Sequence, residues 1–179
     1  MWFDDPTVTQ DYKTRFTSLL KAGQIEIVTG GWVMTEEAPS HYFAMSDQLI
    51  EGHQWLKKHF DYHPKNGYNC DTFGASPTTA YLNHLAGIDH MLIQRTHYVV
   101  KKHFAEQNIL EFNWRQSFDN TGSDETFTHM MPFYSYDVPH TCGPDPSVCC
   151  QFDFRRLRKV SPPVTCPWRK EPIEITKTN

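Results

Sequence analysis

The hydrophobic positions of the chain alternate between short apolar runs and longer stretches with helical spacing. Apolar side chains that recur every three to four residues predict helices at 9–21, 45–60, 77–85 and 98–107. Short apolar runs bounded by polar or turn residues predict strands at 25–28, 68–71, 90–94, 110–115 and 127–131. Strands that alternate with helices in this way are typical of βαβ units, so the pattern predicts an α/β fold with parallel strands.

Polar residues follow three of the predicted strands at the point where each strand ends: the turn at 29–32, Asp71 and Arg95. Right-handed crossovers place the C-terminal ends of parallel strands on one edge of the sheet, where the sites of α/β folds gather. At this edge Asp71 fits a metal ligand, a nucleophile or, as the commonest case, a cap of the following helix. Arg95 fits a functional or a purely structural ion pair with a carboxylate equally well.

Beyond Pro132 the regular pattern ends, and we expect residues 132–170 to form a long irregular loop. Four cysteines crowd into it, with the spacing C-x6-C-C-x15-C. This spacing lacks the C-x2-C pairs that are usual in zinc ribbons and fingers, which favours two disulfides over a zinc site. Disulfides in turn indicate an oxidising compartment. The sequence therefore predicts a disulfide-pinned loop rather than a disordered segment.

The same loop carries aromatic and polar side chains that suit a sugar ligand: Tyr134, Tyr136, Asp137, His140 and Trp168. Aromatic rings stack on the apolar C–H faces of sugars, and carboxylates accept hydrogen bonds from sugar hydroxyls. Aromatic residues in a disulfide loop more often pack the small core of that loop, so both interpretations stay open.

Two further pairs of titratable residues receive structural interpretations. Glu36 and Glu37 are adjacent, whereas the two carboxylates of a glycosidase converge from separate places about 5 Å or more apart. We interpret them as solvated charges or as charges in the first turn of a helix. His59 and His63 lie four residues apart, but Pro64 follows at once and favours an extended or frayed segment over a metal-binding helix face.

Composition narrows the class of protein. A net charge of -4 without a basic stripe excludes a nucleic-acid backbone as partner, and 14% aromatic residues exclude a disordered chain. No apolar run approaches the length of a membrane span, and the polar, acidic N-terminus is not a signal peptide. The 179 residues suffice for one domain, but a complete α/β barrel typically has about 250.

Six runs of the sequence are long and specific enough to identify a family: GQIEIVTGGWVM (23–34), FGASPT (73–78), MLIQRTHY (91–98), HMMPFYSYD (129–137), PHTCGPDPSVCCQFDF (139–154) and CPW (166–168). With these six runs in this order, the chain resembles glycoside hydrolase family 38, and in particular its Golgi-type class II α-mannosidases. The resemblance implies that residues 1–179 are part of the family's N-terminal catalytic domain, a seven-stranded α/β barrel. That part would be incomplete at both ends, with residues 132–170 as a substrate-site loop.

The resemblance also implies an activity. Members of the family are zinc-dependent retaining α-mannosidases that trim mannose from N-linked glycans, so these glycans would be the partner of the chain. The implied location is the Golgi lumen, behind a type II membrane anchor that lies outside this chain.

The resemblance further implies roles for single residues. Asp71 matches the catalytic nucleophile, which also binds the Zn²⁺, and Arg95 would support it. The matching substrate-binding residues are Phe73, Tyr134, Tyr136, Asp137, His140 and Trp168. The implied disulfides are Cys142–Cys149 and Cys150–Cys166, which leaves Cys70 free.

The chain departs from the family pattern at the nucleophile. The family has D-P-F-G-H-S-P-T, whereas Thr72 and Ala75 stand here in place of its proline and histidine. Losing the proline loosens the turn, and losing the histidine removes a polar group near the metal site. The family's H-x-D zinc motif would precede residue 1, and its remaining zinc histidine and general acid would follow Asn179.

One zinc ligand is too few for a catalytic site, which normally takes three from the protein. We therefore expect the isolated chain to be inactive. The alternatives to an enzyme are a degenerate, non-catalytic mannose- or glycan-binding protein and a truncated gene product.

Overall fold

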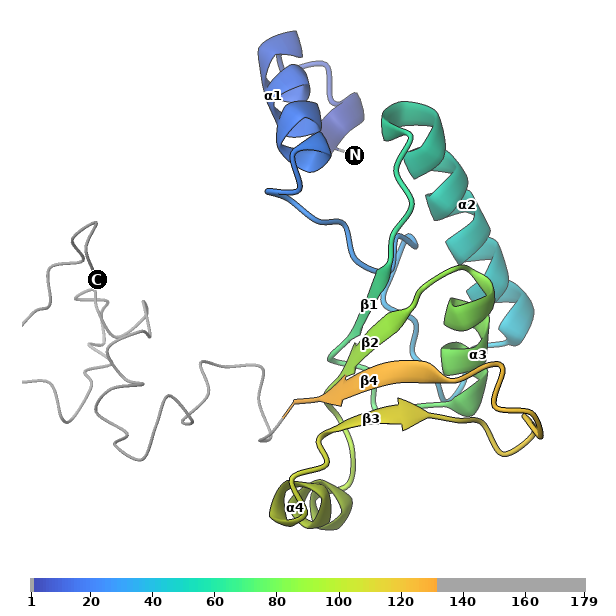
Figure 1. Ribbon diagram of the computed structural model, residues 1–179. Helices are drawn as coiled ribbons and strands as arrows, with labels where there is room; N and C mark the ends of the chain where they lie inside the picture. The colour runs from blue at the N-terminus through green and yellow to red at the C-terminus, as the bar shows by residue number, and fades with distance from the viewer. Residues whose placement is uncertain (1, 132–179) are drawn as a thin grey trace, which may run out of the picture. The chain divides into compact units, whose positions relative to one another are not determined.

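The computed structural model describes residues 2–131 (Figure 1). Its elements in chain order are η1 (Trp2–Asp4), α1 (Gln10–Lys21), α2 (Tyr42–Phe60), β1 (Asn66–Asn69), α3 (Pro77–Leu85), β2 (His90–Ile93), α4 (Tyr98–Glu106), β3 (Glu111–Trp114) and β4 (Thr126–Met130). All four predicted helices are confirmed, and the four later strands are present with shifted ends. The α/β class is therefore confirmed for the described residues.

Within these residues the strands form an open four-stranded sheet in the order β1-β2-β4-β3. β1, β2 and β4 run parallel, but β3 runs antiparallel to β4. The prediction of parallel strands is wrong for β3, and the connection explains why. Residues 115–125 join β3 to β4 without a helix, whereas parallel neighbours need a longer crossover, usually a helical one.

The predicted strand at 25–28 is also wrong, because this segment is not part of the sheet. The Tyr62 hydroxyl occupies its backbone groups instead: it accepts a hydrogen bond from the Ile27 N–H at 3.2 Å and donates one to the Ile27 carbonyl at 3.3 Å. Thr29 then takes a left-handed φ of 58°, which ends the extended run. The Thr29 N–H still donates to the Asn66 carbonyl at 2.8 Å, so the segment runs beside β1 without forming a strand.

Two clusters of buried apolar side chains hold the elements together. The larger one joins the sheet to α3 and α4 and consists of Ala80, Ile88, Met91, Ile93 and Met130, with Phe104, Leu110, Phe112 and Trp114 packed against it. The smaller one joins α1 to α2 through Leu20, Leu56 and Phe60. α2 and α3 are in contact and lie on one side of the sheet in Figure 1.

Glycines allow α2 to pack closely against the turn at residues 29–32. A Cβ atom on Gly52 would lie 2.0 Å from the Gly30 carbonyl oxygen, so a side chain there would force the backbones apart. The Gln48 side chain, one turn earlier in α2, accepts a hydrogen bond from the Val33 N–H at 3.3 Å and donates one to the Thr35 hydroxyl at 3.3 Å. Helix α2 thereby fixes the segment that leads into residues 34–37.

The connection between β3 and β4 is folded around the buried carboxylate of Asp119. This carboxylate accepts hydrogen bonds from the N–H groups of Thr121 and Gly122, both at 2.9 Å, and of Asp124 at 3.1 Å. Because these bonds, led by the one from Asp124, favour the ionised form, they lower the pKa of Asp119 to about 2. The turn is therefore held by contacts among near neighbours in the sequence.

Candidate active site

The structure brings Asp71 and Arg95 together at the C-terminal edge of the sheet. β1 and β2 are parallel neighbours in which Asn69 lies opposite Ile93, and Asp71 and Arg95 each follow two residues later. The Arg95 side chain donates to Asp71 Oδ1 from Nε at 2.7 Å, and its Nη2 lies 2.5 Å from the same oxygen. An ion pair between Arg95 and a carboxylate, expected from the sequence as either functional or purely structural, is thus present. Both side chains remain about two-fifths exposed.

Phe73 completes a small cluster with this ion pair. The Arg95 guanidinium carbon lies 4.9 Å from the centre of the Phe73 ring, within the range of a cation–π contact. The Phe73 side chain is 71% exposed, so its ring presents an apolar surface beside the ion pair. Three of the predicted site residues therefore converge, although they come from two separate strand ends.

The loop that carries Asp71 is anchored by the segment 34–37 rather than by the sheet. The Asp71 N–H donates to Met34 Sδ at 3.3 Å, and the Phe73 N–H donates to the Glu36 carboxylate at 3.1 and 3.2 Å. The Ser76 N–H donates to Glu37 Oε2 at 3.3 Å. Three backbone N–H groups of the Asp71 loop thus donate hydrogen bonds to side chains of the four-residue segment 34–37.

Glu37 is the most buried of these acceptors, with a relative exposure of 6%. Besides Ser76, its carboxylate accepts hydrogen bonds from Asn69 Nδ2 at 3.4 Å and from the Thr72 hydroxyl at 3.3 Å. Burial raises the pKa of Glu37, because the loss of water around the charged form outweighs the hydrogen bonds that favour it.

The interpretation as solvated or first-turn charges is therefore wrong for Glu37, which is buried, whereas Glu36 is half-buried and keeps part of its exposure to water. Neither residue lies in a helix, since α2 begins only at Tyr42, and both carboxylates bond the Asp71 loop. No periodic or short-range pattern could reveal this, because their partners lie 32 to 39 residues further along the chain.

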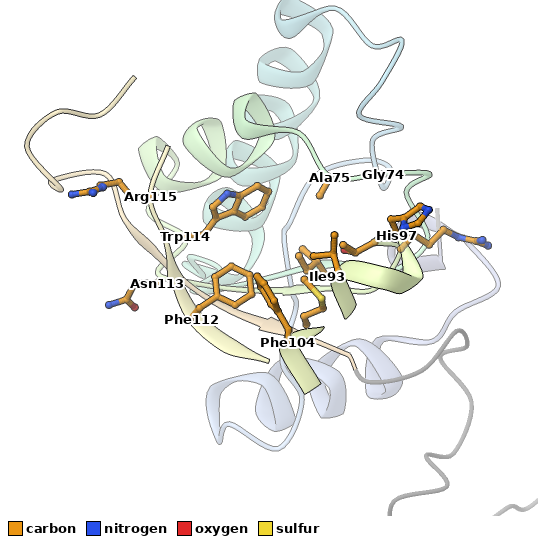
Figure 2. A pocket seen from close by; sticks show the side chains of 13 residues that line it. Gly74, Ala75, Ile93, His97, Phe104, Phe112, Asn113, Trp114 and Arg115 are labelled. Atoms are coloured by element: carbon orange, nitrogen blue, oxygen red, sulfur yellow. The ribbon is translucent and has the colours of Figure 1, made fainter. Parts of the chain in front are cut away.

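A cavity of about 640 Å³ opens beside Arg95 (Figure 2). Its lining is mostly apolar and includes Ile93, Phe104, Phe112 and Trp114. Ala75 also lines the cavity, at the position where the family pattern has histidine. The imidazole that this chain lacks would therefore lie at the border between the cavity and the Asp71 loop.

The described residues do not form a zinc site by themselves. Within residues 2–131, no group of three or more His, Cys, Asp or Glu side chains is arranged to hold a metal ion. Cys70 is buried and is a free thiol in this part of the chain. The other predicted site residues, Tyr134, Tyr136, Asp137, His140 and Trp168, and the four loop cysteines lie outside the described residues.

Comparison with known proteins decides the family. The family model described as "Glycosyl hydrolases family 38 N-terminal domain" matches residues 1–175. The chain belongs to glycoside hydrolase family 38. This chain is 55% identical over 178 residues to "Alpha-mannosidase 2" of Rattus norvegicus and 54% identical over 178 residues to the human protein of that name. Both alignments cover 99% of the present chain. It is 52% identical over 170 residues, or 95% of its length, to the Drosophila melanogaster protein of the same name.

The matched region is a small part of these relatives. The family 38 chain spans 15% of the length of each of the rat, human and fly proteins. The resemblance inferred from the sequence motifs is confirmed, and the Asp71, Phe73 and Arg95 cluster lies within the matched N-terminal domain. None of the helices within residues 2–131 is long and apolar enough to cross a membrane.

Proposed function

We propose that the native polypeptide carrying residues 1–179 is a retaining α-mannosidase that trims N-linked glycans in the Golgi lumen, with Asp71 as its nucleophile. The ion pair between Asp71 and Arg95 carries this proposal. It lies at the C-terminal edge of parallel strands, where α/β enzymes keep their chemistry. The Alpha-mannosidase 2 relatives supply the substrate class.

The residues of this chain suit the first half of a retaining mechanism. A carboxylate oxygen of Asp71 would attack the anomeric carbon, and the bond from that carbon to the leaving oxygen would break. A general acid outside this chain would protonate the leaving oxygen, and water would then release the mannose from Asp71. Arg95 would hold the carboxylate in place, and the exposed Phe73 ring would pack against an apolar face of the sugar.

The remaining parts of the proposal extend beyond the described residues. We propose that this segment completes a seven-stranded α/β barrel with the rest of its domain. Asp71 would contribute one ligand to a zinc ion whose other ligands lie elsewhere, and residues 132–170 would form the substrate-site loop. That loop would carry Tyr134, Tyr136, Asp137, His140 and Trp168, and would be pinned by Cys142–Cys149 and Cys150–Cys166. We expect no turnover by the 179-residue chain alone.

The substitution Asp71→Asn in the native polypeptide tests the nucleophile. We expect the hydrolysis of an aryl α-mannoside to fall on the order of 10³-fold or more, because the amide cannot form the glycosyl-enzyme. Asp89→Asn is the matched control, since Asp89 forms an exposed ion pair with Lys65 away from the cluster. A 2-fluoro-mannosyl fluoride should label the peptide that contains Asp71. Undiminished turnover by Asp71→Asn, or a label on another peptide, contradicts the proposal.

A non-catalytic glycan-binding protein is the second candidate, and Ala75 is the observation that favours it. The small side chain leaves the cavity beside Arg95 open where the family pattern has an imidazole. Calorimetry with a methyl mannoside distinguishes the two functions: heat of binding without zinc and without hydrolysis supports a binding protein.

The size of the native polypeptide distinguishes both candidates from a truncated gene product. An antibody raised against residues 129–154 should detect a polypeptide several-fold larger than 20.9 kDa if this segment belongs to a complete enzyme. A band at 20.9 kDa would contradict the enzyme and leave binding or loss of function.

A further inference from the structure

The position of Asp71 depends on a loop without regular secondary structure. β1 ends at Asn69 and α3 begins at Pro77, so the intervening residues gain no fixed position from a strand ladder or from helical hydrogen bonds. The ion pair with Arg95 restrains one side chain of the loop but not its backbone. The backbone is restrained by the side chains of Met34, Glu36 and Glu37.

Among these three acceptors, Glu37 connects the largest number of elements. Its carboxylate bonds Asn69 at the end of β1, Thr72 directly after Asp71, and the Ser76 N–H at the start of α3. Ser76 is itself the N-cap of α3, where its hydroxyl accepts a hydrogen bond from the Thr78 N–H at 3.2 Å. One buried side chain thus joins both ends of the loop to its middle.

Two of the three partners of Glu37, Asn69 and Thr72, are as buried as Glu37 itself, and Ser76 is half-buried. Asn69 and Thr72 are 3% and 4% exposed, so water cannot easily replace a lost acceptor. Glu36, by contrast, is only half-buried and bonds a single N–H of the exposed residue Phe73. Removing Glu37 should therefore displace the loop, whereas Glu36 has a smaller part in holding it.

We propose that Glu37 is a positioning residue of the active site, which holds the backbone of the Asp71 loop so that the Asp71 carboxylate meets Arg95 and the substrate in one geometry. This role rests on the proposed function of Asp71. Because Glu37 is only 6% exposed, it would act through its hydrogen bonds to Asn69, Thr72 and Ser76 rather than by contact with the substrate.

Three variants of the native polypeptide test this role. Glu37→Ala removes the acceptor, Glu37→Gln keeps its shape and one acceptor oxygen, and Glu51→Ala removes an exposed glutamate of α2 as the matched control. We expect Glu37→Ala to lower kcat per folded molecule by roughly 10- to 100-fold with a much smaller change in KM, because small misplacements of a reacting group cost this much. Glu37→Gln should recover most of the lost kcat, and Glu51→Ala should leave it unchanged.

Amide hydrogen exchange provides a second readout that needs no activity. In Glu37→Ala, the amides of residues 71–76 should exchange faster while those of α2 keep their rates. Turnover that falls only in proportion to the folded fraction, or exchange that rises evenly over the domain, would overturn the positioning role. If Glu37→Ala does not fold, Thr72→Val, which removes one donor to Glu37, decides by the same two readouts.

The two proposals fail in different ways. If the wild-type polypeptide hydrolyses no mannoside, the proposed function fails, and the exchange of residues 71–76 in the variants still decides whether Glu37 holds the loop. If wild-type turnover is normal and Glu37→Ala matches Glu51→Ala in both readouts, only the positioning role fails.

Discussion

Asp119 and Glu37 are both buried carboxylates that hold a loop by accepting backbone N–H groups, yet their surroundings shift their pKa values in opposite directions. Asp119 accepts three backbone N–H groups at 2.9 to 3.1 Å, and these bonds lower its pKa to about 2. Glu37 accepts one backbone N–H and two side-chain donors at 3.3 to 3.4 Å, and burial outweighs them. Asp119 also accepts the Thr121 hydroxyl at 2.9 Å, so its hydrogen bonds outweigh its loss of water, whereas for Glu37 the loss of water is the larger effect.

The two carboxylates also differ in how far their bonds reach along the chain. The partners of Asp119 lie within five residues of it, so its hydrogen bonds stay within one turn. The partners of Glu37 lie 32 to 39 residues away and belong to β1, the Asp71 loop and the start of α3. A change at Asp119 should therefore stay local, whereas a change at Glu37 should reach the candidate active site.

The largest expected effect on stability comes from Glu37→Ala. Buried donors left without an acceptor should lower the free energy of local opening around residues 69–76 by about 2–3 kcal/mol. Exchange of these amides should accelerate by roughly 30- to 150-fold. Asp119→Ala is the counterpart, and its faster exchange should be confined to residues 119–125. If the faster amide exchange in Asp119→Ala extended along the chain as far as that in Glu37→Ala, the comparison between the two carboxylates would be wrong.

Gly52→Ala should disturb the contact between α2 and the turn at residues 29–32. The new Cβ would meet the Gly30 carbonyl oxygen at 2.0 Å, so α2 and the turn at 29–32 must separate, at a cost of about 1–3 kcal/mol. Thermal unfolding of the native polypeptide measures the loss, with Gly23→Ala as control because no atom lies within 4 Å of a Cβ there. Gly23 has a positive φ of its own, so its variant reports conformational strain without a clash. A Gly52→Ala loss no larger than that of Gly23→Ala would contradict the close packing.

The opposite pKa shifts predict opposite pH dependences. The pKa of Asp119 is lower in the folded state, so its contribution to stability is present above its ordinary value of 3.8 and is lost as the pH falls toward 2. The pKa of Glu37 is higher in the folded state, so its contribution is present below its ordinary value of 4.5 and is lost as the pH rises through the raised value. Protection factors of the Gly122 and Ser76 amides, compared at each pH with Asp119→Asn and Glu37→Gln, should show these opposite trends. The same trend at both amides would contradict the assignment.

The local parts of the fold could be predicted from the sequence because local patterns determine them. Helical spacing identified all four helices, and the short apolar runs located β2 and β4 within one or two residues. Asp71 and Arg95 each lie two residues beyond the paired residues Asn69 and Ile93, and because β1 and β2 are parallel, these equal offsets bring the two side chains together. The edge at which these two residues meet could therefore be expected before the structure was known.

The parts that could not be predicted depend on contacts between distant residues. The segment at 25–28 is apolar like a strand, but the hydroxyl of Tyr62, 35 residues away, occupies its backbone groups. Nothing in the sequence distinguishes Glu37 from an exposed glutamate, and it becomes buried only through contacts that form when the chain folds. The direction of β3 depends on a connection whose turn is built around Asp119.

The smallest expected effect concerns Thr72, which stands where the family pattern has proline. We expected the loss of proline to loosen the turn, but the Thr72 hydroxyl donates to Glu37 Oε2 at 3.3 Å, a bond that proline cannot make. Thr72→Val keeps the shape and removes this donor, so the local opening free energy of residues 71–76 should fall by about 1 kcal/mol. Thr14→Val is the matched control, because the Thr14 hydroxyl bonds only within the exposed surface of α1. In a Glu37→Ala background, Thr72→Val should have almost no further effect, since the acceptor is already gone. An additive loss in the double variant would show that Thr72 stabilises the loop without Glu37.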